Sequence, residues 1–352
     1  MGILTAVLLS GLSATAEPLF ELTSIENAGR AVAARVADLD GDGRSDLMVV
    51  SIAGMPPNET REIRVFVQGD DGKLPLVASH VIPVPTLSGV YDLADVMPWP
   101  GVELVVLRTD GVRILSLASN DAPHRDVLVP EGGTIVPAED ERGFEPIKLV
   151  YDDFGAAGDP PWILIPQFGR VVAMTAEGVV EASFDVGRRT NYYIIPRTSL
   201  FSAESDVQLF VDIPKLAVGD VDGDGAVDVV SSTRHELRVF KRRVDGGYDT
   251  APSRKIALGL VTSRDHIRGT GGVASEFADV NKDGRLDLMV SHVEGSISDA
   301  TTTTYVMLNR EGGWALDAPD STFTSHAALA SDTLIDIDGD QAAELLRIRV
   351  KF

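Results

Sequence analysis

The chain has 352 residues, enough to bury a large core as one repeat domain or as two ordinary domains. Hydrophobic residues make up 44% and charged residues 24%, which excludes an intrinsically disordered chain. The net charge of −22 argues against binding to the phosphate backbone of nucleic acids, and the lack of cysteine excludes disulfides and thiolate chemistry.

Residues 1–16 have the pattern of a secretory signal peptide. An apolar run over residues 3–12 precedes Ala14-Thr15-Ala16, whose small side chains fit a cleavage site. No Lys or Arg precedes Arg30, so the basic n-region is missing, and the segment could instead be an apolar first strand. We predict a signal peptide and a secreted, periplasmic or cell-surface protein. No later run reaches the roughly 18 apolar residues of a transmembrane helix.

A nine-residue acidic pattern recurs along the chain, and each copy leads into an apolar run. Three copies carry acidic or amide side chains at positions one, three, five and nine, with glycine at position six. In a fourth copy Gln341 replaces this glycine. The four copies span Asp38–Asp46, Asp220–Asp228, Asp279–Asp287 and Asp336–Glu344.

Two reduced copies lie between the first and second complete ones. Asp95 and Glu103 keep the first and ninth positions of one, and Asp152 begins the other. The first positions therefore fall at 38, 95, 152, 220, 279 and 336, in steps of 57, 57, 68, 59 and 57. This regularity indicates a repeat protein. We expect modules near residues 31–88, 89–145, 146–213, 214–272, 273–328 and 329–352, which together form one domain over residues 17–352.

Each module consists of short apolar runs separated by turn residues. In the first module these runs are residues 34–37, 47–52 and 63–67, and no stretch has a convincing helical period. Four short strands per module predict an all-β protein, a β-propeller of about six or seven four-stranded blades. The last module is too short for four strands, so it is either incomplete or closed by an N-terminal strand. We expect residues 18–24 to pair with it.

Acidic loops of this kind suit Ca²⁺, which takes six to eight oxygen ligands in flexible geometry. Side chains at positions one, three, five and nine, together with the backbone carbonyl at position seven, would surround the ion. Glycine at position six permits the sharp turn. The candidate ligands are Asp38, Asp40, Asp42, Arg44 and Asp46; Asp220, Asp222, Asp224, Ala226 and Asp228; Asp279, Asn281, Asp283, Arg285 and Asp287; and, in the fourth and weakest site, Asp336, Asp338, Asp340 and Glu344.

The acidic loops have two other interpretations. Asp and Gly both favour turns, so a solvated hairpin without an ion is one alternative, although clustered carboxylates repel one another without a cation. An EF-hand requires a bidentate Glu at position twelve and flanking helices. Position twelve here is Val49, Ser231 or Val290. The EF-hand is therefore excluded.

The loops and their flanking strands resemble the FG-GAP / VCBS-type repeats of integrin α-subunit propellers and bacterial surface proteins. The resemblance covers nearly all of the chain after residue 16 and is specific in the four acidic loops. The Phe-Gly and Gly-Ala-Pro elements that give the FG-GAP repeats their name are mostly missing, and Phe154-Gly155 is a lone Phe-Gly pair. The chain is therefore closer to the VCBS-like branch. The resemblance implies an integrin-α-like, calcium-binding propeller.

No catalytic motif is present: the sequence lacks a nucleophile elbow, a P-loop and a dinucleotide-binding fingerprint. We therefore predict a non-enzymatic binding or adhesion module whose partner is an extracellular protein or a glycan. A polysaccharide lyase or hydrolase on a propeller scaffold is an alternative, because propellers host such enzymes. A structural spacer domain of a larger surface protein is another.

A few residues outside the loops are candidates for a ligand surface, each weighed against an ordinary structural role. One candidate is the segment Asp265–Arg268, which could equally be an ordinary exposed loop. The others are the pairs Arg188-Arg189 and Tyr192-Tyr193, which could equally be solvated charges and the aromatic residues of an edge strand. The three tryptophans are expected to pack between blades: Trp99, Trp162 and Trp314.

Overall fold

The computed structural model describes residues 24–54, 58–85, 87–129, 132–136, 144–152, 154, 160–187, 190–196, 205–211, 214–260, 272–295, 300–310, 313–326, 329–335 and 344–350. These residues form strands, turns and connections, and none of them lies in a helix. Accordingly, no described segment is a helix able to cross a membrane. The chain divides into two compact units, Met1–Val150 and Tyr151–Phe352, and each is described by itself.

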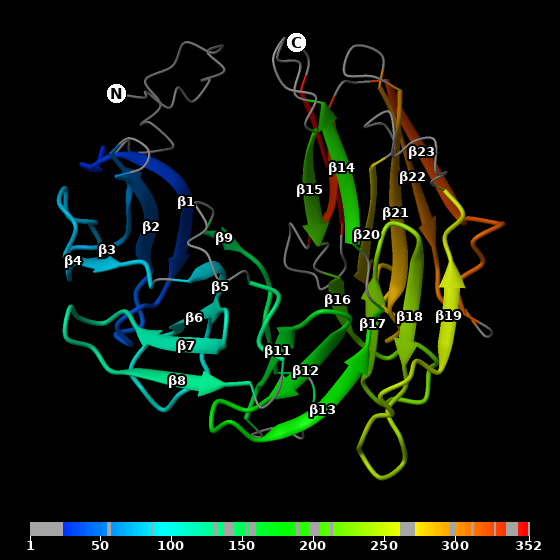
Figure 1. Ribbon diagram of the computed structural model, residues 1–352, viewed down its shortest axis with the longest axis horizontal. Coiled ribbons are helices and arrows are strands. Elements are labelled where there is room, and N and C mark those ends of the chain that lie inside the picture. The colour runs from blue at the N-terminus through cyan, green and yellow to red at the C-terminus, as the bar shows by residue number, and fades with distance from the viewer. Residues whose placement is uncertain are drawn as a thin grey trace, which may run out of the picture. The chain divides into compact units, whose positions relative to one another are not determined.

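The first unit contains two blades, each an antiparallel meander in sequence order (Figure 1). A short parallel strand extends the second blade beyond its innermost strand. The strands are β1 (Arg30–Ala37), β2 (Asp46–Ala53), β3 (Thr60–Phe66) and β4 (His80–Pro83), then β5 (Ser88–Ala94), β6 (Glu103–Arg108), β7 (Gly111–Ser116), β8 (His124–Leu128) and the added β9 (Glu145–Pro146).

The second unit contains three further four-stranded blades and two separate hairpins. The blades are β10 (Val150–Tyr151) to β13 (Val180–Asp185) with β11 (Trp162–Pro166) and β12 (Arg170–Met174); β16 (Lys215–Gly219), β17 (Asp228–Ser232), β18 (Glu236–Phe240) and β19 (Arg254–Ala257); and β20 (Gly272–Ala278), β21 (Asp287–Glu294), β22 (Thr301–Met307) and β23 (Ser321–His326). The hairpins are β14 (Thr190–Pro196) with β15 (Ser205–Val211), and β24 (Leu329–Ile335) with β25 (Glu344–Val350).

Apolar cores lie between successive blades of each unit, because side chains alternate across a strand. In β17 the neighbours Val229 and Val230 are both fully buried and belong to different cores. Val229 packs with Tyr151 and Phe184 of the preceding blade, whereas Val230 packs with Leu288 of the following blade. A strand buried on both faces is a near-continuous apolar run, which explains the sequence pattern.

The predicted fold class is confirmed: the protein is all-β, and its described sheets comprise five blades of a β-propeller, close to the expected six, together with the two hairpins. The described residues of the last module form the hairpin β24–β25, which follows the blade β20–β23. Hydrogen bonds join this hairpin to that blade. The Leu334 amide donates to Glu276 Oε2 at 2.9 Å, and Arg347 donates to Thr304 Oγ1 at 3.0 Å. The proposed signal peptide and nearly all of the proposed closing strand lie outside the described residues.

Two of the three tryptophans pack against cores between blades as expected, whereas Trp99 is half-buried and is not among the residues of these cores. Trp314 is 4% exposed and packs in the core between the last two complete blades, beside Phe277. Trp162 stacks on Phe154 at a ring distance of 4.4 Å, against the core that precedes β16–β19. Tyr192 and Tyr193 lie in β14, whereas Arg188-Arg189 and Asp265–Arg268 are outside the described residues.

Candidate metal centres

Strand pairing places the acidic loops at equivalent positions in their sheets. In every described case the residue before position one pairs with the residue at position nine, so that each loop closes the first two strands of its sheet. The pairs are Ala37 with Asp46, Ala94 with Glu103, Gly219 with Asp228, Ala278 with Asp287 and Ile335 with Glu344. The sequence repeat is therefore also a repeat of backbone register.

Two loops bring three carboxylates together. Ligand atoms of Asp38, Asp40 and Asp42 all lie within 4.8 Å of one another, and the same holds for Asp220, Asp222 and Asp224. Two oxygens on opposite sides of a Ca²⁺ ion are about 5 Å apart, since each lies 2.3–2.6 Å from the metal. Each triad thus fits around one ion, and its all-oxygen chemistry suits a hard cation.

The carboxylate at position one bonds to the backbone of the turn. Asp38 accepts hydrogen bonds from the amides of Gly41, Asp42 and Gly43 at 2.7–3.2 Å. Asp220 accepts hydrogen bonds from the amides of Gly223 and Gly225 in the same manner. The first acid of each of these loops therefore helps to shape the turn.

The third loop has the same backbone with a different ligand set. Asp279 accepts from the amides of Asp283 and Gly284 at 3.1 and 2.7 Å. Asn281 donates its side-chain amide to Asp283 at 3.0 Å, so one neutral side chain stands where the other loops have Asp. Position six is left-handed in all three loops, with φ of +85° at Gly43 and +85° at Gly284, which is the predicted reason for glycine.

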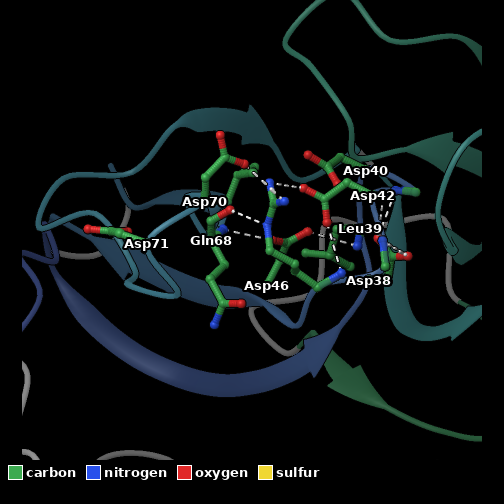
Figure 2. A network of polar contacts seen from close by, with 12 residues as sticks. Asp38, Leu39, Asp40, Asp42, Asp46, Gln68, Asp70 and Asp71 are labelled. Atoms are coloured by element: carbon green, nitrogen blue, oxygen red, sulfur yellow. Dashed lines mark hydrogen bonds and ion pairs between the residues drawn. The ribbon is translucent and has the colours of Figure 1, made fainter.

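The acid at position nine has different surroundings from the other acids. Asp46 is fully buried, and its two oxygens accept the amides of Leu39 at 2.9 Å and Gln68 at 2.7 Å. Figure 2 shows Asp46 between the acidic loop and Gln68. Its carboxylate therefore joins the loop to the end of the third strand. It was predicted only as an ion ligand, and the pattern gave no sign of this second role.

The same arrangement recurs in the other loops. Asp228 accepts the amides of Val221 and Arg242, and burial raises the pKa of Asp228 to about 6. Asp287 accepts the amides of Val280 and Asn309, with its pKa also raised by burial. In each case the amide at position two and an amide at or just beyond the end of the third strand are satisfied.

The reduced loop of the second blade keeps this acid although it has lost the middle acids. Glu103 is fully buried and its Oε2 accepts the amides of Val96 at 2.9 Å and Met97 at 3.2 Å. Burial raises the pKa of Glu103. The acid at position nine thus serves the fold even where no ion site is expected.

Basic side chains balance part of the loop charge. Lys241 forms an ion pair with Asp222, which lowers the pKa of Asp222 and raises that of Lys241. Arg44 pairs with Asp42 and, at 3.1 Å, with Asp70. Burial, followed by repulsion from Asp46, raises the pKa of Asp40. An ion entering the second loop would compete with Lys241 for Asp222.

Consecutive loops within a unit are joined by their backbones. The amide at position eight of one loop donates to the carbonyl at position one of the preceding loop: Val102 to Asp38 at 2.9 Å, and Leu286 to Asp220 at 2.8 Å. At position four, Gly41 lies against Gly101, and Gly223 lies against the guanidinium of Arg285. In both pairs, one loop therefore packs against the next loop along the chain.

An aromatic residue that follows a Gly-Gly pair in two of the modules donates a hydrogen bond to an acidic loop. Tyr248 donates its hydroxyl to the carbonyl of Val227, and Trp314 donates its indole N–H to that of Leu286 at 2.8 Å. Val227 and Leu286 both occupy position eight. The pattern of a glycine turn followed by an aromatic residue was evident in the sequence, but its hydrogen bond to the loop was not.

Most of the predicted ligands in the fourth acidic loop are not among the described residues. Asp336, Asp338 and Asp340 of the fourth loop lie outside the described residues, and only Glu344, the first residue of β25, is described. The fourth site and the role of the position-seven carbonyls of Arg44, Ala226 and Arg285 therefore stay predictions.

Comparison with known proteins agrees with this geometry. Residues 220–290 match the family model of an FG-GAP-like repeat, a span that contains the second and third acidic loops. The resemblance to such repeats is thereby confirmed for this part of the chain. No curated protein sequence matches the chain.

A solved structure is similar in fold. An Agrocybe aegerita lectin, described as specifically recognising non-reducing terminal N-acetylglucosamine, aligns with a TM-score of 0.50. The alignment covers 90% of this chain and 74% of the lectin chain, at 14% sequence identity. At this identity the likeness concerns the fold alone.

Proposed function

We propose that this protein is an exported calcium-binding propeller that recognises glycans and has no catalytic activity of its own. The observation that carries the proposal is the repetition of the acidic turn at one register in successive blades, with two carboxylate triads of suitable size for Ca²⁺. Ions in these turns would neutralise clustered charge and fasten the first two strands of each blade.

The position of the loops supports a structural role for the ions. Each loop lies at one end of its blade, next to a buried acid that already joins it to the third strand. A bound ion would tighten this end and leave the opposite ends of the strands free for ligand recognition.

One observation favours glycans as the ligand class. The similar solved structure is that of a lectin, and the alignment covers most of this chain.

A glycan array tests this proposal. The calcium-loaded protein is screened against neutral and acidic glycans, and any glycan that binds is incubated with the protein and assayed for new reducing ends. We expect at least one glycan class to bind and no new ends to form. Failure of the folded, calcium-loaded protein to bind any glycan would overturn glycan recognition, and release of reducing ends would overturn the non-enzymatic assignment.

A further inference from the structure

A cavity of about 240 Å³ lies between two neighbouring blades of the second unit. Its lining comes from the start of β16, the turn between β17 and β18, and the start of β20: Pro214, Lys215, Ser232, Thr233, Arg234, Val273, Ala274 and Ser275. β16 runs from this cavity to the acidic loop, and β17 returns from the loop to it. The cavity is therefore at the end of these strands opposite the candidate metal centres.

One lining side chain lacks a hydrogen bond. Ser275 is only 5% exposed, and its hydroxyl has no hydrogen-bond partner in the described part of the chain. Its neighbours Val273 and Phe277, on the same face of β20, pack against the core that contains Val230. An unsatisfied buried hydroxyl costs stability. Other buried hydroxyls of the described residues, such as those of Ser231 and Thr302, are unpaired too, but Ser275 is the one among them that lines the cavity, where a ligand could complete its hydrogen bonding.

The same face of β17 supplies a second hydroxyl. Ser232 follows Val230 by two residues, so both side chains are on the face toward β20, and Ser232 is also 5% exposed. Thr233, in contrast, already donates to the carbonyl of Glu236 at 3.1 Å and accepts the amides of His235 and Glu236. Ser232 and Ser275 are thus the hydroxyls suited to a ligand.

The charges at the cavity favour an acceptor-rich ligand. Among the described lining residues Lys215 and Arg234 are basic and none is acidic, although the protein as a whole carries a charge of −22. Lys215 forms an exposed ion pair with Glu276, in which Nζ and Oε1 are 3.5 Å apart. A carboxylate on a ligand could form a shorter, charge-assisted hydrogen bond with this ammonium group. Lysine and arginine only donate hydrogen bonds, so they cannot satisfy the hydroxyl protons of a neutral sugar.

We propose that this cavity binds one carboxylate-bearing monosaccharide unit of a glycan, an inference that rests on the proposed glycan-binding function. Its volume is below the roughly 300–1,000 Å³ of sites for drug-sized ligands, as expected for a single ring. Lys215 binds the carboxylate, Ser232 and Ser275 bind ring hydroxyls, and Val273 contacts the apolar edge of the ring.

Saturation-transfer NMR of the calcium-loaded protein tests the site, with methyl β-D-glucuronide as the probe and methyl β-D-glucoside and sodium acetate as comparisons. We expect the glucuronide to bind at least about tenfold more tightly than either, because only it offers both the ring and the charge. Lys215→Met should weaken this binding about tenfold or more. Lys255→Met, an exposed lysine on β19 outside the cavity, is the matched control and should have no effect.

Ser275→Ala separates a ligand role from a structural one. Removing an unpaired buried hydroxyl should leave the Tm unchanged or raise it, while glucuronide binding weakens. Equal glucuronide binding by the wild type, Lys215→Met and Ser275→Ala would overturn the cavity assignment and leave glycan recognition intact. Equal binding of the glucoside or of acetate would overturn the proposed ligand class. Absence of any glycan ligand on the array would instead remove the proposed function itself.

Discussion

In the first three complete acidic loops the acid at position nine is buried and accepts hydrogen bonds from the backbone, whereas the side chains at positions one, three and five belong to the turn itself. Asp46 satisfies two amides from separate parts of the first blade. Asp40 accepts one weak bond at 3.2 Å from Asp42 within the loop. The two residues are six positions apart, and we infer different contributions: Asp46 to folding, Asp40 to the ion.

Substitution of these two acids should show the difference in metal-free buffer. Asp46→Ala leaves two backbone amides unpaired and should lower the free energy of unfolding by about 2–4 kcal/mol even in EDTA. Asp40→Ala should change it by less than about 0.5 kcal/mol in EDTA, since only charge repulsion is relieved, but should remove one bound Ca²⁺. Urea denaturation with and without calcium measures both. Equal destabilisation of the two variants in EDTA would contradict this division of roles.

Glu103 allows a pH test in a loop that lacks the middle acids. Burial raises its pKa above the ordinary 4.5, so the folded state holds the proton more tightly than the unfolded state. The stability contributed by this group is complete below about pH 4.5 and is lost as the pH rises through the folded pKa. Glu103→Gln keeps an acceptor for Val96 without the charge.

The stability of Glu103→Gln relative to wild type should therefore increase between pH 4.5 and pH 7.5. Urea midpoints in saturating calcium at several pH values measure this difference. A difference between the two proteins that is constant across this range would show that the buried charge of Glu103 is unimportant for stability.

Consecutive loops form a connected element rather than independent turns. Gly41 packs on the next loop, where an added Cβ would lie 2.7 Å from the Gly101 amide nitrogen and 2.9 Å from Pro100 Cβ. Gly43 has a similar backbone, with φ of +85° against +81°, but an added Cβ there meets nothing within 4 Å. A substitution at Gly43 therefore tests backbone strain alone, whereas the same substitution at Gly41 tests strain together with the contact between loops.

Gly43→Ala should cost about 1–2 kcal/mol, the strain of a left-handed alanine. Gly41→Ala adds a clash with backbone and should cost about 2 kcal/mol more. Urea denaturation of both variants in saturating calcium gives the comparison. Equal costs would show that the loops of the first unit do not support each other.

The sequence predicted the parts of the loop that depend on local spacing. The acidic or amide side chains recur at every second position of the turn, at positions one, three and five, and position six requires glycine because its backbone is left-handed. The second role of position nine was not predictable in this way. Its partners Gln68, Arg242 and Asn309 lie 22, 14 and 22 residues further along the chain, and only sheet register brings them to the loop.

At the scale of the whole molecule, the repeat spacing predicted the fold. The step from 152 to 220 is longer than the others, and the hairpin β14–β15, which was not predicted, lies between β13 and β16. The cavity beside Ser275 was not predicted, because its lining comes from two blades. Spacing within one module cannot show which side chains meet between modules.

The central claim is that Ca²⁺ bound in the acidic loops stabilises the blades. In 1 mM Ca²⁺, sites with dissociation constants of about 0.1 mM would each add roughly 1.4 kcal/mol, so two or three sites should raise the Tm by about 4–6 °C. Magnesium at the same concentration should restore little, because it requires rigid octahedral geometry.

Thermal unfolding followed by circular dichroism, in EDTA and then after addition of calcium or magnesium, measures this directly. The variant Asp40→Ala/Asp222→Ala, which removes one ligand from each triad, is the control and should lose most of the calcium response. We expect EDTA to lower the Tm of the wild type and calcium, but not magnesium, to restore it. A wild-type Tm that is the same in EDTA and in calcium would contradict the account.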